Sequence, residues 1–380
     1  METGPNMGSQ QSPASRVEQW RFRPHPLLRG GHLQTVVGIY LRFQARPYGA
    51  RLHYLPATAR SPLEEGDQLV LHEDRPAGWS EGDPVVLLIH GLGGSFRSTY
   101  MTRVADRLVQ RGCTAFRMDM RGCGQGAAVA KGPTHCGRSE DVRTALAHLA
   151  RLYPRSPTLA VGFSLGGMLI LNMLAEAGDS PIGNYHRGLA ICPPIDLFDV
   201  ERRFATRGGR PYERFFIRVL WRQIARRWRR FPELVVPEIT QRPRRLRVLD
   251  EHVIAPAAGY ASADAYYAAT QAGPKLAAIR QPVSIVAAED DPVVPSGPLL
   301  QYPRSADVET VLMPSGGHLG FVGRGSGDPD SRWLDWRIVE WVEASANLGN
   351  RRANERSRGS VAVQDALERS RSVGHREACR

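Results

Sequence analysis

The stretch from Thr158 to Ala177 constrains the fold of this chain most strongly. A short apolar run, Thr158–Val161, is followed by Gly162-Phe163-Ser164-Leu165-Gly166 and then by a helical pattern that reaches Ala177. This order predicts a strand, a sharp turn and a helix, in which the glycines relieve the crowding around the residue at the turn. The alternative is an ordinary helix start rich in Gly and Ser, but the preceding strand favours the sharp turn.

Short strands and helices alternate along much of the chain, as expected for a mostly parallel sheet flanked by helices. Pro84–Ile89 is a continuous apolar run, which is typical of a strand buried in the centre of such a sheet. The other predicted strands cover residues 113–118, 158–161, 187–192, 283–287 and 308–313. The predicted helices cover residues 98–111, 139–152, 164–177 and 332–346.

The interval between the strands predicted at 187–192 and 283–287 is about ninety residues long, far beyond an ordinary strand-to-helix connection. It starts with Pro193-Pro194 and has a helical pattern of its own, so we expect an inserted helical cap. The chain beyond Gly349 is rich in Arg and Ser and poor in aromatic residues, which is typical of disorder. The predicted organisation is a flexible N-terminus (1–20), a core in two parts (21–192 and 276–346), a cap (193–275) and a basic disordered tail (347–380).

Positive charge is concentrated in one part of the chain. The formal net charge is +12, and residues 202–250 hold fifteen arginines against four acidic residues. Local basicity of this kind usually marks a contact surface for an anionic partner. The region has no recognisable nucleic-acid-binding module, so we expect no nucleic-acid partner.

The five cysteines are scattered and odd in number, with no Cys-x-x-Cys pair. This pattern argues against a disulfide framework and against a zinc site, and it favours a reducing compartment. No apolar run reaches the roughly 18 residues of a membrane span, and residues 1–16 lack the apolar core of a signal peptide. We therefore predict a cytoplasmic location, and no motif indicates a cofactor or a metal.

Ser164, at the predicted sharp turn, is the candidate nucleophile. A serine hydroxyl at neutral pH reacts poorly unless a base takes its proton and an acid orients that base. His318 is the candidate base, because it alone of 11 histidines lies in a glycine-rich loop directly after the strand at 308–313. The order Ser, acid, His along the chain is the order that this kind of sheet requires.

Three neighbouring acids compete for the role of the orienting acid, since all follow the strand predicted at 283–287. Asp291 is preferred, because Asp-x-Val-Val-Pro has the form expected after the acidic member. Asp290 is the alternative, and Glu289 more simply ends the strand.

An oxyanion formed by attack of Ser164 would need two backbone N–H donors. The candidates for this oxyanion hole are Leu165, directly after Ser164 at a helix N-terminus, and Leu92, in His90-Gly91-Leu92-Gly93-Gly94. Glycine in this second loop lets the backbone approach a substrate. Taken alone, the loop fits a phosphate cradle, but it lacks the Lys-Ser/Thr of a P-loop and the Gly-x-Gly-x-x-Gly spacing.

Together these motifs resemble the AB hydrolase-4 family, the YheT-like enzymes with an α/β-hydrolase fold. The resemblance covers roughly residues 20–345, and its specific parts are an N-terminal block, Phe22–Leu28 with Gly31–Thr35, and a second block, Gly316–Phe321. The less specific shared motifs lie at 90–94, 121–124, 162–166 and 290–292.

The resemblance implies the α/β-hydrolase fold, a charge-relay site on Ser164, Asp291 and His318, and hydrolysis of carboxylic or lipid esters. His25 and His32 belong to the N-terminal block. We interpret both as structural, because a catalytic histidine needs a nucleophile and an orienting group within reach.

Residues 214–230 predict a helix with two unlike faces. The spacing of its side chains puts an arginine row and an apolar row on opposite sides: Arg214, Arg218, Arg222, Arg226 and Arg230 against Phe216, Leu220, Ile224 and Trp228. The apolar row is expected to pack on the core or to line an acyl pocket. The arginine row is either a solvated helix face or a landing surface for an anionic membrane.

The leading prediction is therefore a serine esterase that forms an acyl-enzyme on Ser164 and takes a small-molecule or lipid ester. An acyltransferase that uses the same three residues is the first alternative, and a lipid hydrolase bound to an anionic membrane is the second. A protein of another class, which binds anions through the cap while the site is idle, is disfavoured by the complete set of Ser164, Asp291 and His318.

Overall fold

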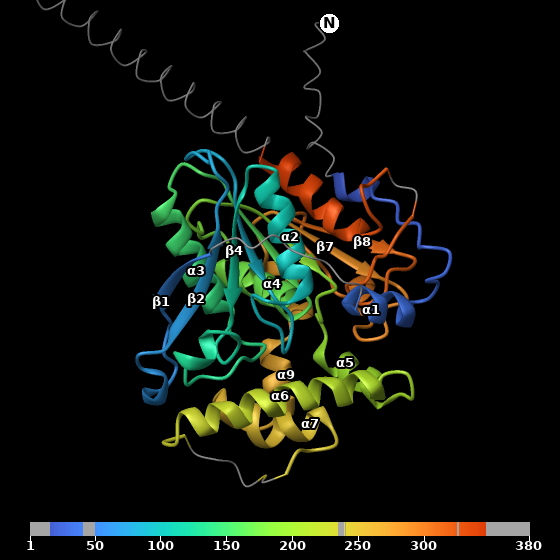
Figure 1. The fold of residues 1–380 in the computed structure, drawn as a ribbon. Helices are drawn as coiled ribbons and strands as arrows, with labels where there is room; N and C mark the ends of the chain where they lie inside the picture. Colours follow the sequence, from blue (N-terminus) through green and yellow to red (C-terminus); the bar gives the residue numbers. More distant parts are fainter. Residues whose placement is uncertain (1–15, 41–49, 235–238, 240, 325–326, 347–380) are drawn as a thin grey trace, which may run out of the picture.

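A computed structural model of the protein describes residues 16–40, 50–234, 239, 241–324 and 327–346. Its centre is an eight-stranded sheet with the strand order β1-β2-β4-β3-β5-β6-β7-β8 (Figure 1). β1 and β2 are antiparallel to their neighbours, and the pairs from β4 to β8 are parallel. The strands are β1 (Arg51–Pro56), β2 (Gln68–Asp74), β3 (Val85–Ile89), β4 (Thr114–Asp119), β5 (Thr158–Phe163), β6 (Tyr185–Ile191), β7 (Val283–Ala288) and β8 (Val308–Met313).

Helices cover both faces of this sheet. Alternate residues of a strand point to opposite faces, so Leu87 of β3 packs with α3 (Ser139–Leu152) and α4 (Leu165–Ala177). Leu88 packs on the other face with α2 (Thr99–Gln110) and with the helical residues 333–346. Burial of β3 on both faces explains its uninterrupted apolar run.

The α/β-hydrolase fold predicted from the sequence is confirmed, and the six predicted strands are present with shifts of one or two residues at some ends. β1 and β2 were not predicted. β1 alternates polar and apolar residues at the sheet edge, and β2 ends in His-Glu-Asp, so neither has the continuous apolar run of a central parallel strand.

A layer of helices between β6 and β7 lies across the carboxyl ends of the parallel strands (Figure 1). The longest, α6 (Arg210–Arg230), includes the helix predicted at 214–230. The other elements are α5 (Leu197–Ala205), α7 (Leu246–Leu249), the π-helix η4 (Asp250–Ile254), α8 (Ala255–Ala257), α9 (Ala263–Thr270) and the 3-10 helix η5 (Gly273–Ala278). We call this layer the cap; its predicted limits at residues 193 and 275 stay predictions.

The ordered core begins earlier than expected. Residues 16–19 form the 3-10 helix η1, and Val17 and Trp20 are buried, with the Trp20 ring 5.7 Å from that of Trp333. The predicted flexible N-terminus (1–20) thus overlaps with residues 16–20, which pack on the core through two large apolar side chains. Residues 1–15 and the predicted tail at 347–380 lie outside the described residues.

Candidate active site

Ser164 occupies a strained turn between β5 and α4. Its φ of 52° and ψ of −117° are unusual for a residue with a side chain. A Cβ atom on Gly162 would lie 2.4 Å from the carbonyl carbon of Gly166, and one on Gly166 would lie 2.3 Å from the carbonyl oxygen of Ile89. Both positions therefore require glycine, and the turn presents the serine hydroxyl above the carboxyl end of the sheet.

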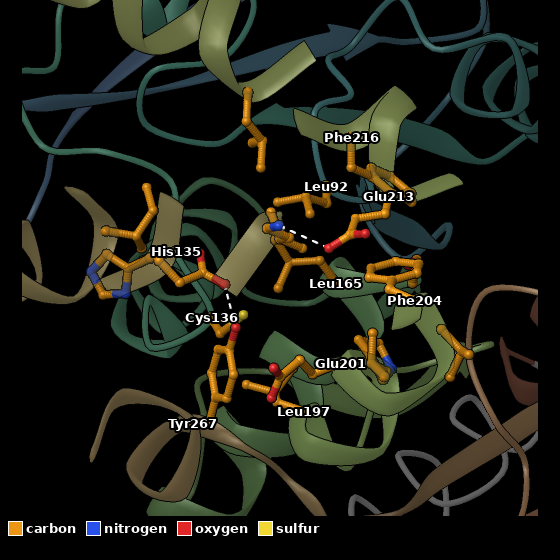
Figure 2. Close-up of a pocket in the computed structure, with 18 of the residues that line it drawn as sticks. Leu92, His135, Cys136, Leu165, Leu197, Glu201, Phe204, Glu213, Phe216 and Tyr267 are labelled. Atoms are coloured by element: carbon orange, nitrogen blue, oxygen red, sulfur yellow. Dashed lines mark hydrogen bonds between the residues drawn. The ribbon is translucent and has the colours of Figure 1, made fainter. Parts of the chain in front are cut away.

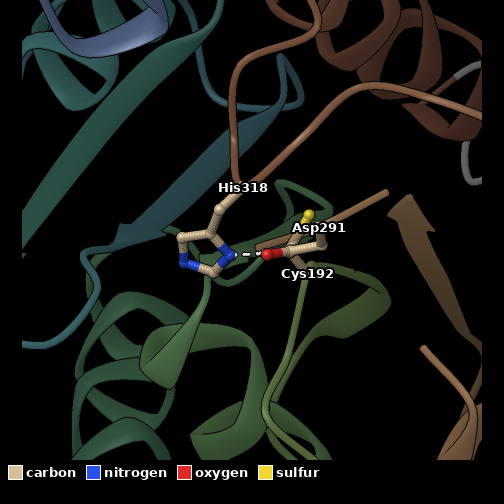
Figure 3. Close-up of side chains that lie close together, drawn as sticks. All are labelled: Cys192, Asp291 and His318. Carbon is tan, nitrogen blue, oxygen red and sulfur yellow. Dashed lines mark hydrogen bonds and ion pairs between the residues drawn. The ribbon is translucent and has the colours of Figure 1, made fainter. Parts of the chain in front are cut away.

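His318 lies between Ser164 and Asp291 and contacts both. Its Nδ1 is 2.8 Å from Asp291 Oδ2 (Figure 3), and its Nε2 is 3.1 Å from Ser164 Oγ. A carboxylate accepts, so Nδ1 donates to Asp291 and Nε2 is left with the lone pair that faces the serine hydroxyl. All three side chains are buried, which strengthens these contacts relative to water.

Asp291 is held by the backbone that follows it. Its Oδ1 accepts hydrogen bonds from the N–H groups of Val293 at 2.8 Å and Val294 at 2.9 Å. The Asp-x-Val-Val segment thus folds back over its own carboxylate, and this turn leaves Oδ2 free for His318.

The neighbouring acids contact other groups. Asp290 Oδ1 accepts a hydrogen bond from the backbone N–H of Gly317 at 2.8 Å, so Asp290 binds the loop that carries His318 and not the His318 ring. Glu289 is exposed, and its N–H continues the pairing with Met313 at the end of the sheet. Of the three candidates, Asp291 is the one that the structure brings against His318.

The N-terminal block supports the same loop from the other side. Thr35 Oγ1, on α1 (Gly31–Tyr40), accepts a hydrogen bond from the backbone N–H of His318 at 2.8 Å and donates to Gly31 O at 2.7 Å. Gln34 Oε1 accepts from the N–H of Val322 at 2.7 Å. A Cβ atom on Gly38 would lie 2.7 Å from Gly320 Cα, so helix and loop touch. The two most specific sequence blocks therefore form one packed unit.

His25 and His32 lie away from this hydrogen-bonded chain. His25 Nδ1 accepts from the N–H of Leu27 at 3.3 Å, within its own turn. His32 Nδ1 lies 2.9 Å from the hydroxyl of Tyr212 on α6, and the two rings stack. His32 thus connects α1 to the cap.

The loop with Leu92 is fixed by two side chains. The hydroxyl of Tyr100 accepts from the N–H of Gly91 at 2.9 Å, and the His90 Nδ1–H donates to Gly91 O at 2.8 Å. Met120 N–H donates to His90 Nε2 at 3.3 Å, which fixes the tautomer, and burial lowers the pKa of His90, so the ring is neutral. Neither Tyr100 nor His90 was assigned this part from the sequence.

Leu92 and Leu165 lie together on the wall of a cavity that also includes Ser164 (Figure 2). Leu165 is the first residue of α4, where backbone N–H groups have no partner within the helix. Among the described residues, neither N–H group donates a hydrogen bond to another backbone group. Both amides are therefore available to an oxygen atom bound beside Ser164.

The rest of this cavity is formed mainly by apolar side chains from the cap and from the segment after β7. They are Leu197, Val200, Phe204, Phe216, Leu220, Leu246, Ile254, Val293 and Val294. The apolar row expected on the helix at 214–230 thus contributes Phe216 and Leu220 to the cavity, while Ile224 is buried in the core. An apolar chain attached to a group at Ser164 fits this lining.

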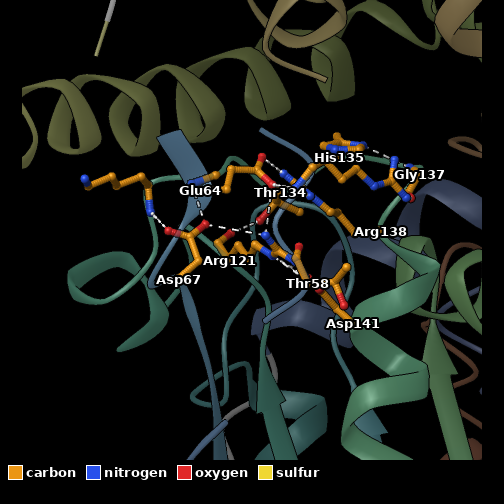
Figure 4. Close-up of polar contacts among 12 residues, drawn as sticks. Thr58, Glu64, Asp67, Arg121, Thr134, His135, Gly137, Arg138 and Asp141 are labelled. Carbon is orange, nitrogen blue, oxygen red and sulfur yellow. Dashed lines mark hydrogen bonds and ion pairs between the residues drawn. The ribbon is translucent and has the colours of Figure 1, made fainter. Parts of the chain in front are cut away.

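A buried ionic network supports another part of the cavity wall. Arg121 is fully buried and donates to Asp141 at 2.6 Å, to Glu64 at 3.2 Å and to Thr58 O at 2.7 Å (Figure 4). Burial opposes its charge, but these partners raise the pKa of Arg121, which stays cationic. Thr134, whose hydroxyl bonds to Arg121 O, begins the cavity-lining stretch 134–136. The network therefore holds that stretch in place.

Cys192 is a further buried group at the site, and the sequence did not single it out. It follows β6 in a left-handed conformation (φ 47°), and its Sγ lies within 4.8 Å of the polar atoms of Asp291 and His318 (Figure 3). Burial raises the pKa of Cys192 well above its ordinary value, so it is a neutral thiol. Cys192, Asp291 and His318 are close enough together to hold a metal ion, but His318 and Asp291 already bond to each other. The absence of a metal stays a prediction.

The sequence and the fold are those of a known family. The sequence matches the family described as the alpha/beta hydrolase family over residues 86–330. This match covers more than half of the chain, so the protein belongs to that family and has hydrolase function at that general level. The crystal structure of 2,6-dihydroxy-pseudo-oxynicotine hydrolase has the same fold, with a TM-score of 0.50, 16% identity and coverage of 79% of this chain and 69% of that one.

Two relatives show to which group within the hydrolase family the chain belongs. The chain is 30% identical to YheT of Escherichia coli over 316 residues, which cover 82% of this chain and 89% of YheT. It is 24% identical to the phospholipase ABHD3 of Homo sapiens over 313 residues, which cover 77% of this chain and 75% of ABHD3. The protein therefore belongs to the YheT-like group, the AB hydrolase-4 family, as its motifs predicted.

Proposed function

We propose that the protein hydrolyses carboxylic esters through an acyl-enzyme on Ser164. The observation that carries this proposal is the chain of hydrogen bonds from Ser164 Oγ through His318 to Asp291, which opens into an apolar cavity. Relatives point the same way, since YheT carries an esterase designation and ABHD3 is named a phospholipase.

In this mechanism, Ser164 Oγ attacks the ester carbonyl while His318 Nε2 takes the hydroxyl proton. Asp291 holds the ring and stabilises the imidazolium that forms. The N–H groups of Leu92 and Leu165 bind the oxyanion of the tetrahedral intermediate. His318 then protonates the leaving alcohol, and in the second half it activates the water that releases the acid.

Because the cavity is lined mainly by apolar side chains, we propose that it binds the acyl group of the ester, which is either a chain of short to medium length or the acyl chain of a lipid. An acyltransferase would share every one of these residues and differ only in the acceptor. Product formation that depends on an added alcohol or thiol, with little free acid released, would identify the acyltransferase.

The test of the proposed function is a hydrolysis profile over p-nitrophenyl esters of increasing chain length. We expect a maximum at one chain length, with a fall for longer chains as the cavity fills. Ser164→Ala should lower kcat by at least about 10⁴-fold, because the residue lost is the nucleophile. No hydrolysis at any length, by a protein shown to be folded, would contradict the proposal.

We also propose that the outer face of α6 binds an anionic membrane surface. The five arginines of the row from Arg214 to Arg230 are all exposed, on the side opposite the buried Leu220 and Ile224. A groove beside this row is lined by further arginines, among them Arg242, Arg244 and Arg245. Guanidinium groups hold phosphate in a bidentate manner, which favours a lipid surface over a merely solvated face.

No helix in the described ranges is long and apolar enough to cross a membrane. The proposed contact at the α6 face is peripheral, because its exposed arginines would meet lipid headgroups at the surface. The reducing, cytoplasmic location stays a proposal that rests on the scattered, odd-numbered cysteines of the sequence.

A further inference from the structure

A buried carboxyl group lines the cavity of the candidate site. Asp250 is the first residue of the π-helix η4 and is 8% exposed. It lines the same cavity as Ser164, among side chains that are mostly apolar. Single-turn π-helices are rare and occur frequently at functional sites. Neither the proposed chemistry nor the sequence motifs account for an acid at this point.

Among the described residues, the Asp250 side chain has one hydrogen-bond partner. The hydroxyl of Tyr267, on α9, donates to Asp250 Oδ2 at 2.5 Å. The second oxygen, Oδ1, accepts no hydrogen bond within the described part of the chain. Burial raises the pKa of Asp250 to about 7; the Tyr267 hydrogen bond opposes this rise and the charge of Glu201 adds to it. A carboxyl oxygen without a protein partner in a mostly apolar cavity is unfavourable unless water or a ligand pairs with it.

The surroundings form a small polar corner. Tyr267 and Cys136 lie together on the cavity wall, away from Leu92 (Figure 2). The Cys136 N–H donates to the hydroxyl of Tyr266 at 2.8 Å, and burial raises the pKa of the Cys136 thiol to about 12. These neighbours are neutral, and the nearby cation Arg247, which opposes the rise in the pKa of Asp250, is itself paired with Glu201 at 3.0 Å.

We propose that Asp250 and Tyr267 select acyl chains that carry a hydroxyl group toward their far end. This inference rests on the proposed function, because the chain would enter the cavity from an ester carbonyl at Ser164. A hydroxyl group can donate to Asp250 Oδ1 when the carboxyl is ionised and accept from it when the carboxyl is protonated. A methyl-ended chain at the same place leaves the carboxyl oxygen unpaired, and sites of this kind discriminate strongly against such analogues.

The direct test is ligand binding to the Ser164→Ala variant, in which no hydrolysis occurs. Methyl ω-hydroxyalkanoates and methyl alkanoates of about four to ten carbons are compared by calorimetry. At the chain length that reaches the polar corner, the hydroxyl compound should bind about tenfold more tightly, as expected for a hydrogen bond to a charged group. Because binding is the readout, this result does not depend on whether the wild-type protein hydrolyses esters.

A double substitution of Asp250 and Tyr267 tests whether the preference for the hydroxyl ligand comes from this polar corner. Asp250→Leu with Tyr267→Phe substitutes apolar groups of similar size, which avoids leaving one polar partner buried alone. In the Ser164→Ala background, the variant with both substitutions should bind the methyl-ended ligand more tightly than the hydroxyl ligand. Glu201→Gln is the matched control, since Glu201 also lines the cavity but pairs with Arg247 at 3.0 Å, and it should keep the hydroxyl preference.

Two results would overturn the inference. One is the absence of any hydroxyl preference at every chain length in the protein with Asp250. The other is an unchanged preference in the Asp250→Leu/Tyr267→Phe variant, shown to be folded by near-ultraviolet circular dichroism. Loss of hydrolysis in Ser164→Ala alone bears only on the proposed function.

Discussion

The backbone N–H of His318 donates to the hydroxyl of Thr35, 283 residues earlier in the chain, at 2.8 Å. The helix that carries Thr35 thereby sets the position of the loop, and with it the distance from the His318 ring to Ser164. The N-terminal block is thus a support for the candidate base, although it provides no group that faces the cavity of the site.

Thr35→Val should therefore lower kcat about 10- to 100-fold with a small change in KM, since the buried N–H of His318 loses its acceptor and the ring shifts. Thr35→Ser, which keeps the hydroxyl, is the matched control and should retain most of the activity. Steady-state kinetics on a p-nitrophenyl ester measures both. Equal kcat values for the Val and Ser variants would show that the loop does not depend on this bond.

The acids next to each other in the sequence should differ sharply in effect. Asp291→Asn should lower kcat by about 10³- to 10⁴-fold, because the imidazolium of His318 loses its charged partner and the tautomer changes. Asp290→Asn leaves an oxygen that can still accept from Gly317 N–H, so a far smaller loss is expected. A larger effect of Asp290→Asn would move the acid's role to that residue.

The central strands could be predicted from the sequence, because residues such as Leu87 and Leu88 are buried on both faces and give an uninterrupted apolar run. Ser164, Asp291 and His318 were also predictable, since each follows a strand end in a fixed chain order. The antiparallel strands β1 and β2 were missed, because β1 is a mostly exposed edge strand and the buried β2 ends in His-Glu-Asp, so neither has that run.

The groups that hold the site together depend on contacts between distant parts of the chain. Thr35 and His318 are far apart in sequence, and Asp250 meets Tyr267 only because η4 and α9 pack in the cap. No local spacing encodes such pairs. For Thr35 and His318, the only sequence signal was that they lie in the family blocks at 22–35 and 316–321. For Asp250 and Tyr267, there was no signal in the sequence.

If the arginine row of α6 binds anionic lipid, vesicle binding should depend on its charge. Replacing Arg218, Arg222 and Arg226 with Glu should weaken binding to vesicles that contain anionic lipid by at least about tenfold at low salt, and the difference should shrink as salt rises. Hydrolysis of a small soluble ester should survive, because these side chains point away from the cavity of Ser164.

The matched control places the same charge change elsewhere on the surface, at the exposed Arg151, Arg155 and Arg280. Vesicle sedimentation compares the two triple variants with the wild type. If all three proteins bind anionic vesicles equally at low salt, α6 has only a solvated arginine face.

Asp250 should make stability depend on pH. Its pKa in the folded protein is about 7, above the ordinary value of 3.8, so between these values the folded state holds a proton that the unfolded state has lost. The stabilising contribution is complete below about pH 4 and is lost as the pH rises through about 7. Relative to Asp250→Asn, the free energy of unfolding of the wild type should fall by a few kcal/mol, on the order of 1 to 4, over this range.

Urea unfolding of both proteins at several pH values measures this difference. The Asn variant removes only the titrating group and keeps an oxygen that can accept from Tyr267. A difference that stays constant from pH 4 to pH 8 would contradict a raised pKa at Asp250.

The central claim is that Ser164 is the nucleophile, and covalent labelling with a fluorophosphonate tests it most directly. A serine activated by His318 attacks the phosphorus and keeps a stable adduct, which intact-mass spectrometry counts and peptide mapping locates. We expect one adduct per chain, on Ser164, and none on Ser164→Ala under the same conditions. An adduct on another residue, or labelling of folded Ser164→Ala at the wild-type rate, would contradict the assignment.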